Sequence, residues 1–192
     1  MARYGKEHKD ATRRRIVEAA GRRLKRDGID GSGVATVMAD AGLTNGAFYG
    51  HFASKEDLVA TVVADQLRQQ LEGYHAHVVD REGVERFVRT YLSMEHRDDR
   101  EHGCPSAALL DEIGRCGDAT RHAYTDGVLG LVDEIASIVA PDDPRSARGP
   151  TLSLFALLIG TLQLSRALAD RKLAEEVLER GVENALTLLP GE

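Results

Sequence analysis

Cys104 is the residue of this sequence best placed for chemistry, because it directly precedes Pro105, where a helix is expected to begin. A helix N-terminus stabilises a thiolate through the helix dipole. His102 lies two residues earlier. A reactive, redox-sensitive thiol is therefore one interpretation, and an inert cap cysteine is the other. Cys116 lies 12 residues further on, about 18 Å along a continuous helix and beyond disulfide reach within one chain.

Other polar residues give little support for a catalytic or metal site. His75 and His77 point to different sides of a helix, because residues two apart do not face each other. His96, His102 and Cys104 could meet at a metal ion, or the two histidines could be exposed loop residues. No nucleophile elbow, phosphate loop or carboxylate pair can be placed on a suitable scaffold. We therefore expect no enzyme activity, no metal site and no cofactor.

The elements that position these residues are helices. Ile16, Ala20 and Leu24 recur at the spacing of one buried stripe, and Gly28 follows where a left-handed C-cap is favoured. The predicted helices span residues 9–27, 34–41, 44–51, 54–79, 82–97, 105–116, 118–140, 150–169 and 171–189, with proline-rich and charged loops over 97–103 and 141–150. No segment alternates with period two, so we predict an all-α fold of about nine helices.

The charges are separated along the chain. The net charge is −6, but residues 1–57 carry 11 Lys and Arg against 8 Asp and Glu, and residues 58–192 carry 14 against 23. A positive end on a negative body attracts phosphate at one place. The alternative interpretation is a solvated basic helix face.

A helix-turn-helix is predicted between Gly33 and His51. Two short helices meet at Gly42, which can supply the positive φ of a sharp turn, and the second could enter a ~12 Å wide major groove. The segment from Ala41 to Leu58, AGLTNGAFYGHFASKEDL, closely resembles the signature of TetR-type transcriptional repressors. The resemblance is dense over residues 12–58, and the order and length of the helices extend it over the whole chain.

The resemblance implies roles for individual positions. Asn45 and Ala47 would face base edges, since Asn pairs with adenine and Ala touches the thymine methyl group. Tyr49 would lie against the DNA backbone or a base, and Phe48 and Phe52 would be core anchors. Phosphate contacts would come from Thr44, His51 and Lys55. The predicted DNA-binding residues are Ser32, Gly33, Thr44, Asn45, Gly46, Ala47, Tyr49, His51 and Lys55.

Two positions depart from the family pattern. Gly33 stands where the family usually has Ser or Thr, so the phosphate contact of the first short helix is expected to pass to Ser32. Gly50 stands where many members have a larger side chain, which would narrow base readout or let the backbone approach DNA.

The C-terminal helices are expected to form a dimer interface, because one recognition helix reads too few base pairs. Their apolar faces also fit a second interpretation, in which each monomer covers them with its own core. By resemblance to the family, two helices from each chain would form a four-helix interface. The predicted interface residues are Leu152, Phe155, Ile159, Gln163, Val177, Val182 and Leu186.

The middle helices would enclose a ligand pocket, as they do in TetR-type repressors. The segment from Gly103 to Leu109 is also similar to one in TetR-type regulators that include sensors of reactive electrophiles. The candidate ligand or sensor residues are Cys104, His102, Tyr91, Met94, Tyr124 and Phe155, although each hydrophobic one could be plain core.

Together these features predict a transcriptional regulator, in the family most often a repressor. It would bind a palindromic double-stranded operator as a homodimer and be released by a small molecule or an electrophile. Residues 1–53 would form the DNA-binding domain and residues 54–192 the ligand-binding and dimerisation domain. With no signal sequence, no apolar stretch of membrane-spanning length and two cysteines, a cytoplasmic location is expected. A helical interaction protein that does not contact DNA is the rival interpretation.

Overall fold

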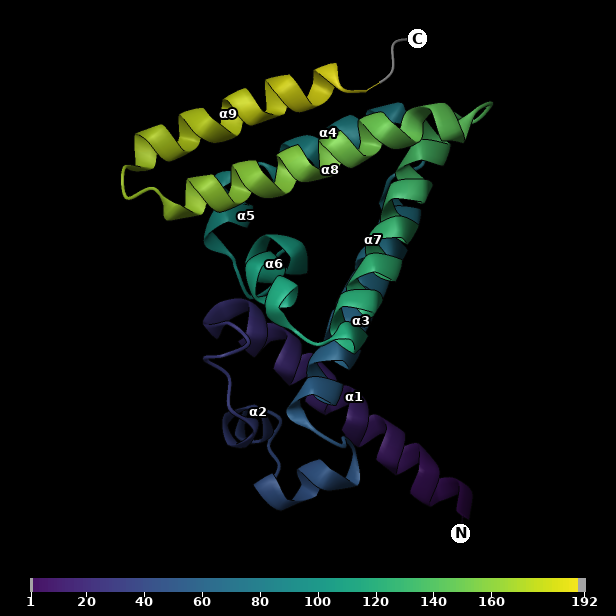
Figure 1. Ribbon diagram of the computed structural model, residues 1–192, viewed down its shortest axis with the longest axis vertical. Coiled ribbons are helices and arrows are strands. Elements are labelled where there is room, and N and C mark those ends of the chain that lie inside the picture. The colour runs from purple at the N-terminus through teal and green to yellow at the C-terminus, as the bar shows by residue number, and fades with distance from the viewer. Residues whose placement is uncertain (1, 190–192) are drawn as a thin grey trace.

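The computed structural model describes residues 2–189, and side chains from residue 7 onward. Within that range the chain forms nine α-helices and one 3-10 helix and contains no strand, so the predicted all-α fold is confirmed (Figure 1). The helices are α1 (Ala2–Asp27), α2 (Val34–Asp40), η1 (Asn45–Gly50), α3 (Lys55–His77), α4 (Arg81–Tyr91), α5 (Met94–Asp98), α6 (Pro105–Arg115), α7 (Asp118–Val139), α8 (Pro144–Ala167) and α9 (Arg171–Thr187).

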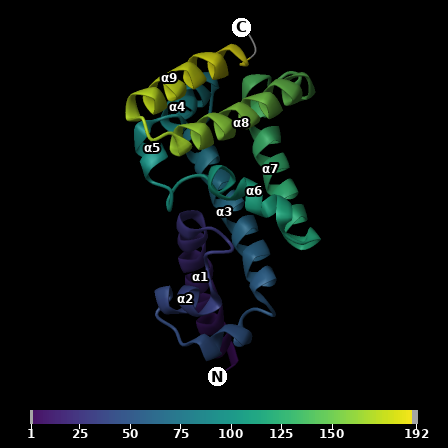
Figure 2. The same ribbon diagram turned by 60° about the vertical axis from the view of Figure 1, so that its left-hand side comes forward.

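The N-terminal helices form a small head at one end of the molecule, where α1 packs beside α2 and α2 packs against η1 (Figures 1 and 2). Ile16 and Leu24 of α1, Met38 of α2 and Phe48 of η1 are buried together. Gly28 and Gly42 adopt the positive φ angles predicted for them, +81° and +66°, at the turns that end α1 and α2. The head is therefore a three-helix unit closed by two glycine turns.

The remaining helices form the body. Helix α3 leaves the head and packs lengthwise against α7, while α8 and α9 lie side by side at the opposite end (Figure 1). The Ser54 hydroxyl caps α3 by accepting from the amide of Asp57, 3.1 Å away, as the sequence predicts. Helix α3 begins at the head and continues through the body, so the two parts share one helix. The predicted domain boundary between residues 53 and 54 stays a prediction.

Several predicted elements differ from the structure, since α1 begins at Ala2 and not at residue 9, and the second short helix is a 3-10 helix. The helix expected over 82–97 is divided at Leu92 into α4 and α5, because the Ser93 hydroxyl caps a new helix by accepting from the amide of His96, 3.2 Å away. The loop expected over 141–150 is also too long, since α8 already begins at Pro144. Proline is tolerated at the first helical position, and Pro150 costs one hydrogen bond near the exposed start of the helix.

Candidate nucleic-acid interface

The outer face of η1 is exposed to solvent. Thr44, Asn45 and Gly46 are exposed, and the Tyr49 side chain is 74% exposed although it is aromatic. Thr44 occupies the N-cap position, but its hydroxyl makes no capping hydrogen bond. Ala47 is half-buried. The predicted base-reading and phosphate-binding side chains of this short helix thus share one solvent-facing surface, with donors and acceptors free to meet a ligand.

The inner face of η1 holds it against the head. Phe48 and Phe52 are buried as predicted, with their rings stacked at 5.7 Å between centroids. The amide of Leu43 donates to the carbonyl of Met38 at 2.8 Å and closes the turn at Gly42. Two large aromatic anchors under a helix of six residues fix which side faces outward.

Arg13 of α1 is a positioning residue that the sequence did not single out. Its guanidinium donates to the carbonyl of His51, at the end of η1, and to the hydroxyl of Thr61 at 3.2 Å. It also lies 4.1 Å from the centre of the Phe52 ring, in a cation–π contact. The only sequence signal was the basic composition of α1, which does not distinguish a clamp from a solvated charge.

Three predicted phosphate contacts have other surroundings than expected. Ser32 is only 1% exposed, and its hydroxyl donates to the carbonyl of Gly28 at 2.6 Å, so the expected transfer of a contact from Gly33 to Ser32 is not supported. The Lys55 amine donates to the carbonyl of Ile29 at 2.6 Å and so stabilises the turn after α1. Gly33 itself is exposed at the N-cap of α2, without a side chain to contribute.

His51 is half-buried at the edge of this surface. Its Nδ1 is buried with no hydrogen-bond partner among the described residues, and burial, together with the charges of Lys9 and Arg13, lowers its pKa. A neutral imidazole can still donate one hydrogen bond to a phosphate oxygen. Its contact with DNA remains a prediction.

A cavity of about 650 Å³ opens between the head and the body. Its wall combines α1 with α3, α4 and the segment from α5 to α6. Among the candidate sensor residues, Tyr91, His102 and Cys104 line it. Met94, Tyr124 and Phe155 are not among its lining residues and pack, partly buried, against the core. Sequence reasoning missed that Arg22 and Lys25 of α1 contribute to the wall.

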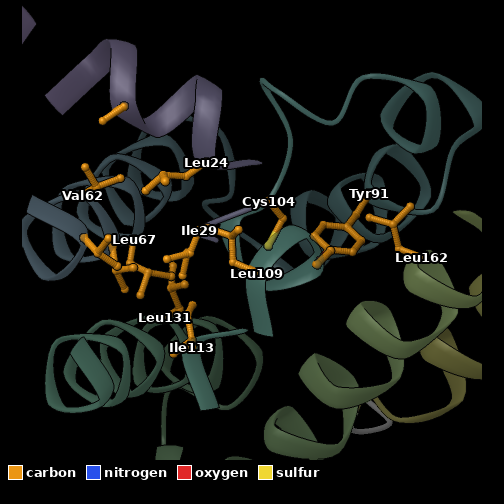
Figure 3. Packing of buried hydrophobic residues seen from close by; sticks show 14 of the residues in the cluster. Leu24, Ile29, Val62, Leu67, Tyr91, Cys104, Leu109, Ile113, Leu131 and Leu162 are labelled. Atoms are coloured by element: carbon orange, nitrogen blue, oxygen red, sulfur yellow. The ribbon is translucent and has the colours of Figure 1, made fainter. Parts of the chain in front are cut away.

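Cys104 occupies the N-cap of α6, as predicted, and is buried. Its amide donates to Nε2 of His96 at 3.1 Å, and Nδ1 of His96 lies 2.7 Å from the carbonyl of Tyr91. His96 is thus a neutral bridge, and burial lowers its pKa. Figure 3 shows the Cys104 thiol beside the Tyr91 ring. Within the described residues, no group of three His, Cys, Asp or Glu is arranged to hold a metal ion.

Hydrogen bonds of Glu112 and Lys25 tie the body to the end of α1 and to the turn that follows it. One carboxylate oxygen of Glu112, in α6, accepts from the amides of Ile29 and Asp30 at 2.6 and 3.0 Å. The Lys25 amine, in the last turn of α1, donates to the carbonyl of Gly103 at 3.0 Å. Helix α6 therefore links the cavity, where it begins, to the helix-turn-helix, where it ends.

The predicted dimer face lies on α8 and α9, at the end of the body away from the head (Figure 1). Leu152 is exposed, and so is Leu164, at 53%. Ile159 is different, since at 4% exposure it belongs to the core of the monomer. Phe155, Gln163, Val177, Val182 and Leu186 are half-buried. In the described chain, no helix is apolar over a stretch long enough to cross a membrane.

The head matches known regulators in sequence. Residues 16–62 match the model of a family described as bacterial regulatory proteins, tetR family. Over these residues this chain is similar to the tetR family, in a match that covers less than half of its length. It is 38% identical over 63 residues to the HTH-type transcriptional regulator TtgR of Pseudomonas putida, a match that covers 33% of this chain and 30% of TtgR. The matched segment thus spans less than a third of the length of TtgR, which is a transcriptional regulator.

Over most of its length the chain also matches solved structures in fold. The reduced form of NemR from E. coli superposes with a TM-score of 0.78 at 16% identity, covering 95% of this chain and 100% of NemR. A TetR-family regulator from Agrobacterium tumefaciens gives 0.73 at 18% identity, covering 92% and 98%. FadR of Bacillus subtilis in complex with stearoyl-CoA gives 0.63 at 18% identity, covering 88% and 96%.

Proposed function

We propose that this protein is a TetR-family regulator that represses transcription by binding a palindromic operator as a homodimer. The observation that carries the proposal is the exposed outer face of η1, where Thr44, Asn45 and Tyr49 point away from two buried aromatic anchors. An exposed, polar and aromatic face on a short buttressed helix is what a major-groove reader needs. In this proposal residues 1–53 bind DNA, and residues 54–192 bind the effector and form the dimer.

The proposed contacts divide into base readout and phosphate positioning. Asn45 pairs with a base edge, most simply adenine, and Ala47 and Gly46 allow close approach to the groove floor. Tyr49 packs on the sugar-phosphate backbone or a base. Thr44 and His51 hydrogen-bond phosphates, while Lys55 supports the same contacts through the turn that it holds.

The proposed dimer uses the outward faces of α8 and α9. Leu152 and Leu164 are exposed there, which is costly for a monomer in water. Two helices from each chain would bury these side chains in a four-helix interface and set the spacing of the two heads.

The proposed effector site is the cavity between head and body. Among the structures of similar fold, NemR is in a reduced form and FadR is in complex with stearoyl-CoA. For this chain both a non-covalent ligand and an electrophile acting at Cys104 fit the function, because the thiol lies on the cavity wall at the start of α6. Either would act by favouring a state in which the paired heads no longer match their half-sites.

A salt-dependent gel shift with the DNA upstream of the gene tests the central part of this proposal. We expect affinity to fall steeply as salt rises, because phosphate neutralisation releases counterions. A helical interaction protein without DNA contact would give no shifted band at any salt concentration. The electrophile branch is tested separately: if Cys104→Ser leaves release by diamide or quinones unchanged, that branch is wrong.

A further inference from the structure

Lys25 is the one described lysine that combines deep burial with a place on a cavity wall. It is 8% exposed, although it lies in the last turn of a basic helix. Its amine makes a single hydrogen bond, to the carbonyl of Gly103, and among the residues that the structure describes no carboxylate lies within ion-pair distance. Asp99 and Glu101 act on it only from further away. Burial therefore dominates and lowers the pKa of Lys25 to about 8.

The same cavity holds a hydrogen-bond donor without an acceptor. The Tyr91 hydroxyl is buried and has no partner among the described residues, apart from the nearby thiol of Cys104, which is a weak acceptor. The side chain is 5% exposed, and burial raises its pKa well above the ordinary value, so it keeps its proton. An unpaired buried hydroxyl costs free energy unless a ligand oxygen completes it.

The charges around the cavity disfavour an anionic ligand. The acidic side chains on its wall are Glu18, Glu95, Asp99 and Glu101, against the cations Arg22 and Lys25. The rings of Phe87 and Tyr91 lie 5.5 Å apart and give the cavity an aromatic surface. The wall thus suits a neutral molecule with an apolar or aromatic body and an oxygen that accepts a hydrogen bond.

We propose that Lys25 captures an aldehyde in this cavity as a reversible imine. The lone pair of the neutral amine forms a bond to the carbonyl carbon, and the carbonyl oxygen, held by the Tyr91 hydroxyl, gains a proton as the nitrogen loses one. In the resulting carbinolamine the hydroxyl group takes the remaining proton of the nitrogen and leaves as water when the carbon–oxygen bond breaks, while the nitrogen lone pair forms the carbon–nitrogen double bond. Amine and aldehyde give imine and water, so no oxidant or reductant takes part.

The consequence for regulation rests on the proposed function. An imine leaves the Lys25 nitrogen with at most one N–H, tied to a ligand that occupies the cavity, so its hydrogen bond to Gly103 is lost or weakened. Gly103 lies two residues before α6, whose Glu112 holds the turn after α1. Capture at Lys25 would therefore remove one link between the head and the body, at the end of α6 opposite Glu112.

Reductive trapping on the full chain tests the proposal, with benzaldehyde as probe and sodium cyanoborohydride as the trap. The chain has only five lysines, at positions 6, 9, 25, 55 and 172, so peptide mass spectrometry assigns every product. At about pH 7.5 we expect Lys25 to be labelled about tenfold faster than the exposed Lys172, because a pKa near 8 leaves far more neutral amine than an ordinary lysine has. Equal or slower labelling of Lys25 overturns the proposal, as does an adduct on Cys104 in place of Lys25.

Two variants separate capture from simple accessibility. Lys25→Met, which keeps most of the buried stem, is expected to lose the fast product, while Lys172→Met keeps it. Tyr91→Phe removes only the hydroxyl and is expected to slow labelling of Lys25 several-fold, with the helical circular dichroism unchanged. An unaltered rate in Tyr91→Phe contradicts the role of that hydroxyl. A parallel gel shift distinguishes the two proposals: DNA binding without labelling overturns the capture alone, and labelling without DNA binding overturns the regulator alone.

Discussion

Replacing Glu112 with alanine is expected to destabilise the protein and release the helix-turn-helix from the body. One carboxylate oxygen accepts from the amides of Ile29 and Asp30 at 2.6 and 3.0 Å. Hydrogen bonds to a charged group contribute about 1.5–3 kcal/mol when the partner is buried, and much less when water can replace it. Ile29 is buried and Asp30 is exposed, so the loss is dominated by one bond, and we expect about 2 kcal/mol.

Urea denaturation measures this loss directly. With an m-value of about 2 kcal/mol/M, the midpoint is expected to fall by about 1 M while the slope stays the same. Hydrogen exchange at the Ile29 amide is expected to accelerate more than exchange at amides in the middle of α3. Glu112→Gln, which keeps an oxygen acceptor without the charge, is expected to lose about half as much free energy.

Asp111→Ala is the matched control. The Asp111 carboxylate also lies on α6, next to Glu112 in the sequence, but it forms its ion pair with the exposed Arg115, 2.6 Å away. Exposed pairs of this kind contribute less than about 1 kcal/mol. The reasoning is wrong if Glu112→Ala is no less stable than Asp111→Ala, or if exchange at Ile29 does not change.

Three further perturbations test the site. Asn45→Ala is expected to cost about 1–3 kcal/mol at a single base pair and to relax preference there in a binding-site selection, and an unchanged preference contradicts the assignment. Arg13→Ala is expected to weaken operator binding by about tenfold, because Arg13 holds the end of η1 in place. The slope of log affinity against log salt concentration is expected to stay the same, and a slope smaller by about one would mean that Arg13 contacts a phosphate directly. Burial lowers the pKa of His96 in the folded protein, so the unfolded chain binds its proton first as the pH falls below about 6.5. Below that pH the free energy of unfolding is therefore expected to fall more steeply in the wild type than in His96→Gln. Urea titrations at several pH values that give parallel curves of unfolding free energy against pH would refute this.

Local features of the head could be predicted from the sequence. The positive φ angles of Gly28 and Gly42 could be predicted because each glycine follows the apolar stripe of a helix. The N-cap at Ser54 could be predicted because this residue precedes an acidic first turn. The burial of Phe48 and Phe52 followed from the need of short helices for large anchors. Each of these depends on residues within a few positions of one another, where helix periodicity and capping rules apply.

The links between head and body could not be predicted in the same way. Lys25 meets Gly103 across 78 positions of sequence, and Glu112 meets Ile29 across 83. Helix periodicity says which face of a helix is apolar, but it does not say which distant loop a buried amine or carboxylate reaches. For the same reason the sequence could not predict that the cavity is lined by Tyr91, His102 and Cys104 but not by Met94, Tyr124 or Phe155.

Selection of binding sites from random double-stranded DNA, followed by sequencing, tests the central claim most directly. The account predicts enrichment of an inverted repeat whose half-site centres lie about 34–36 Å apart, or a multiple of that distance, because two η1 helices would read successive faces of the duplex. The double substitution Asn45→Ala and Tyr49→Ala is expected to abolish the enrichment without unfolding the head. A wild-type selection that yields no motif, or one without a two-fold repeat, would contradict the account.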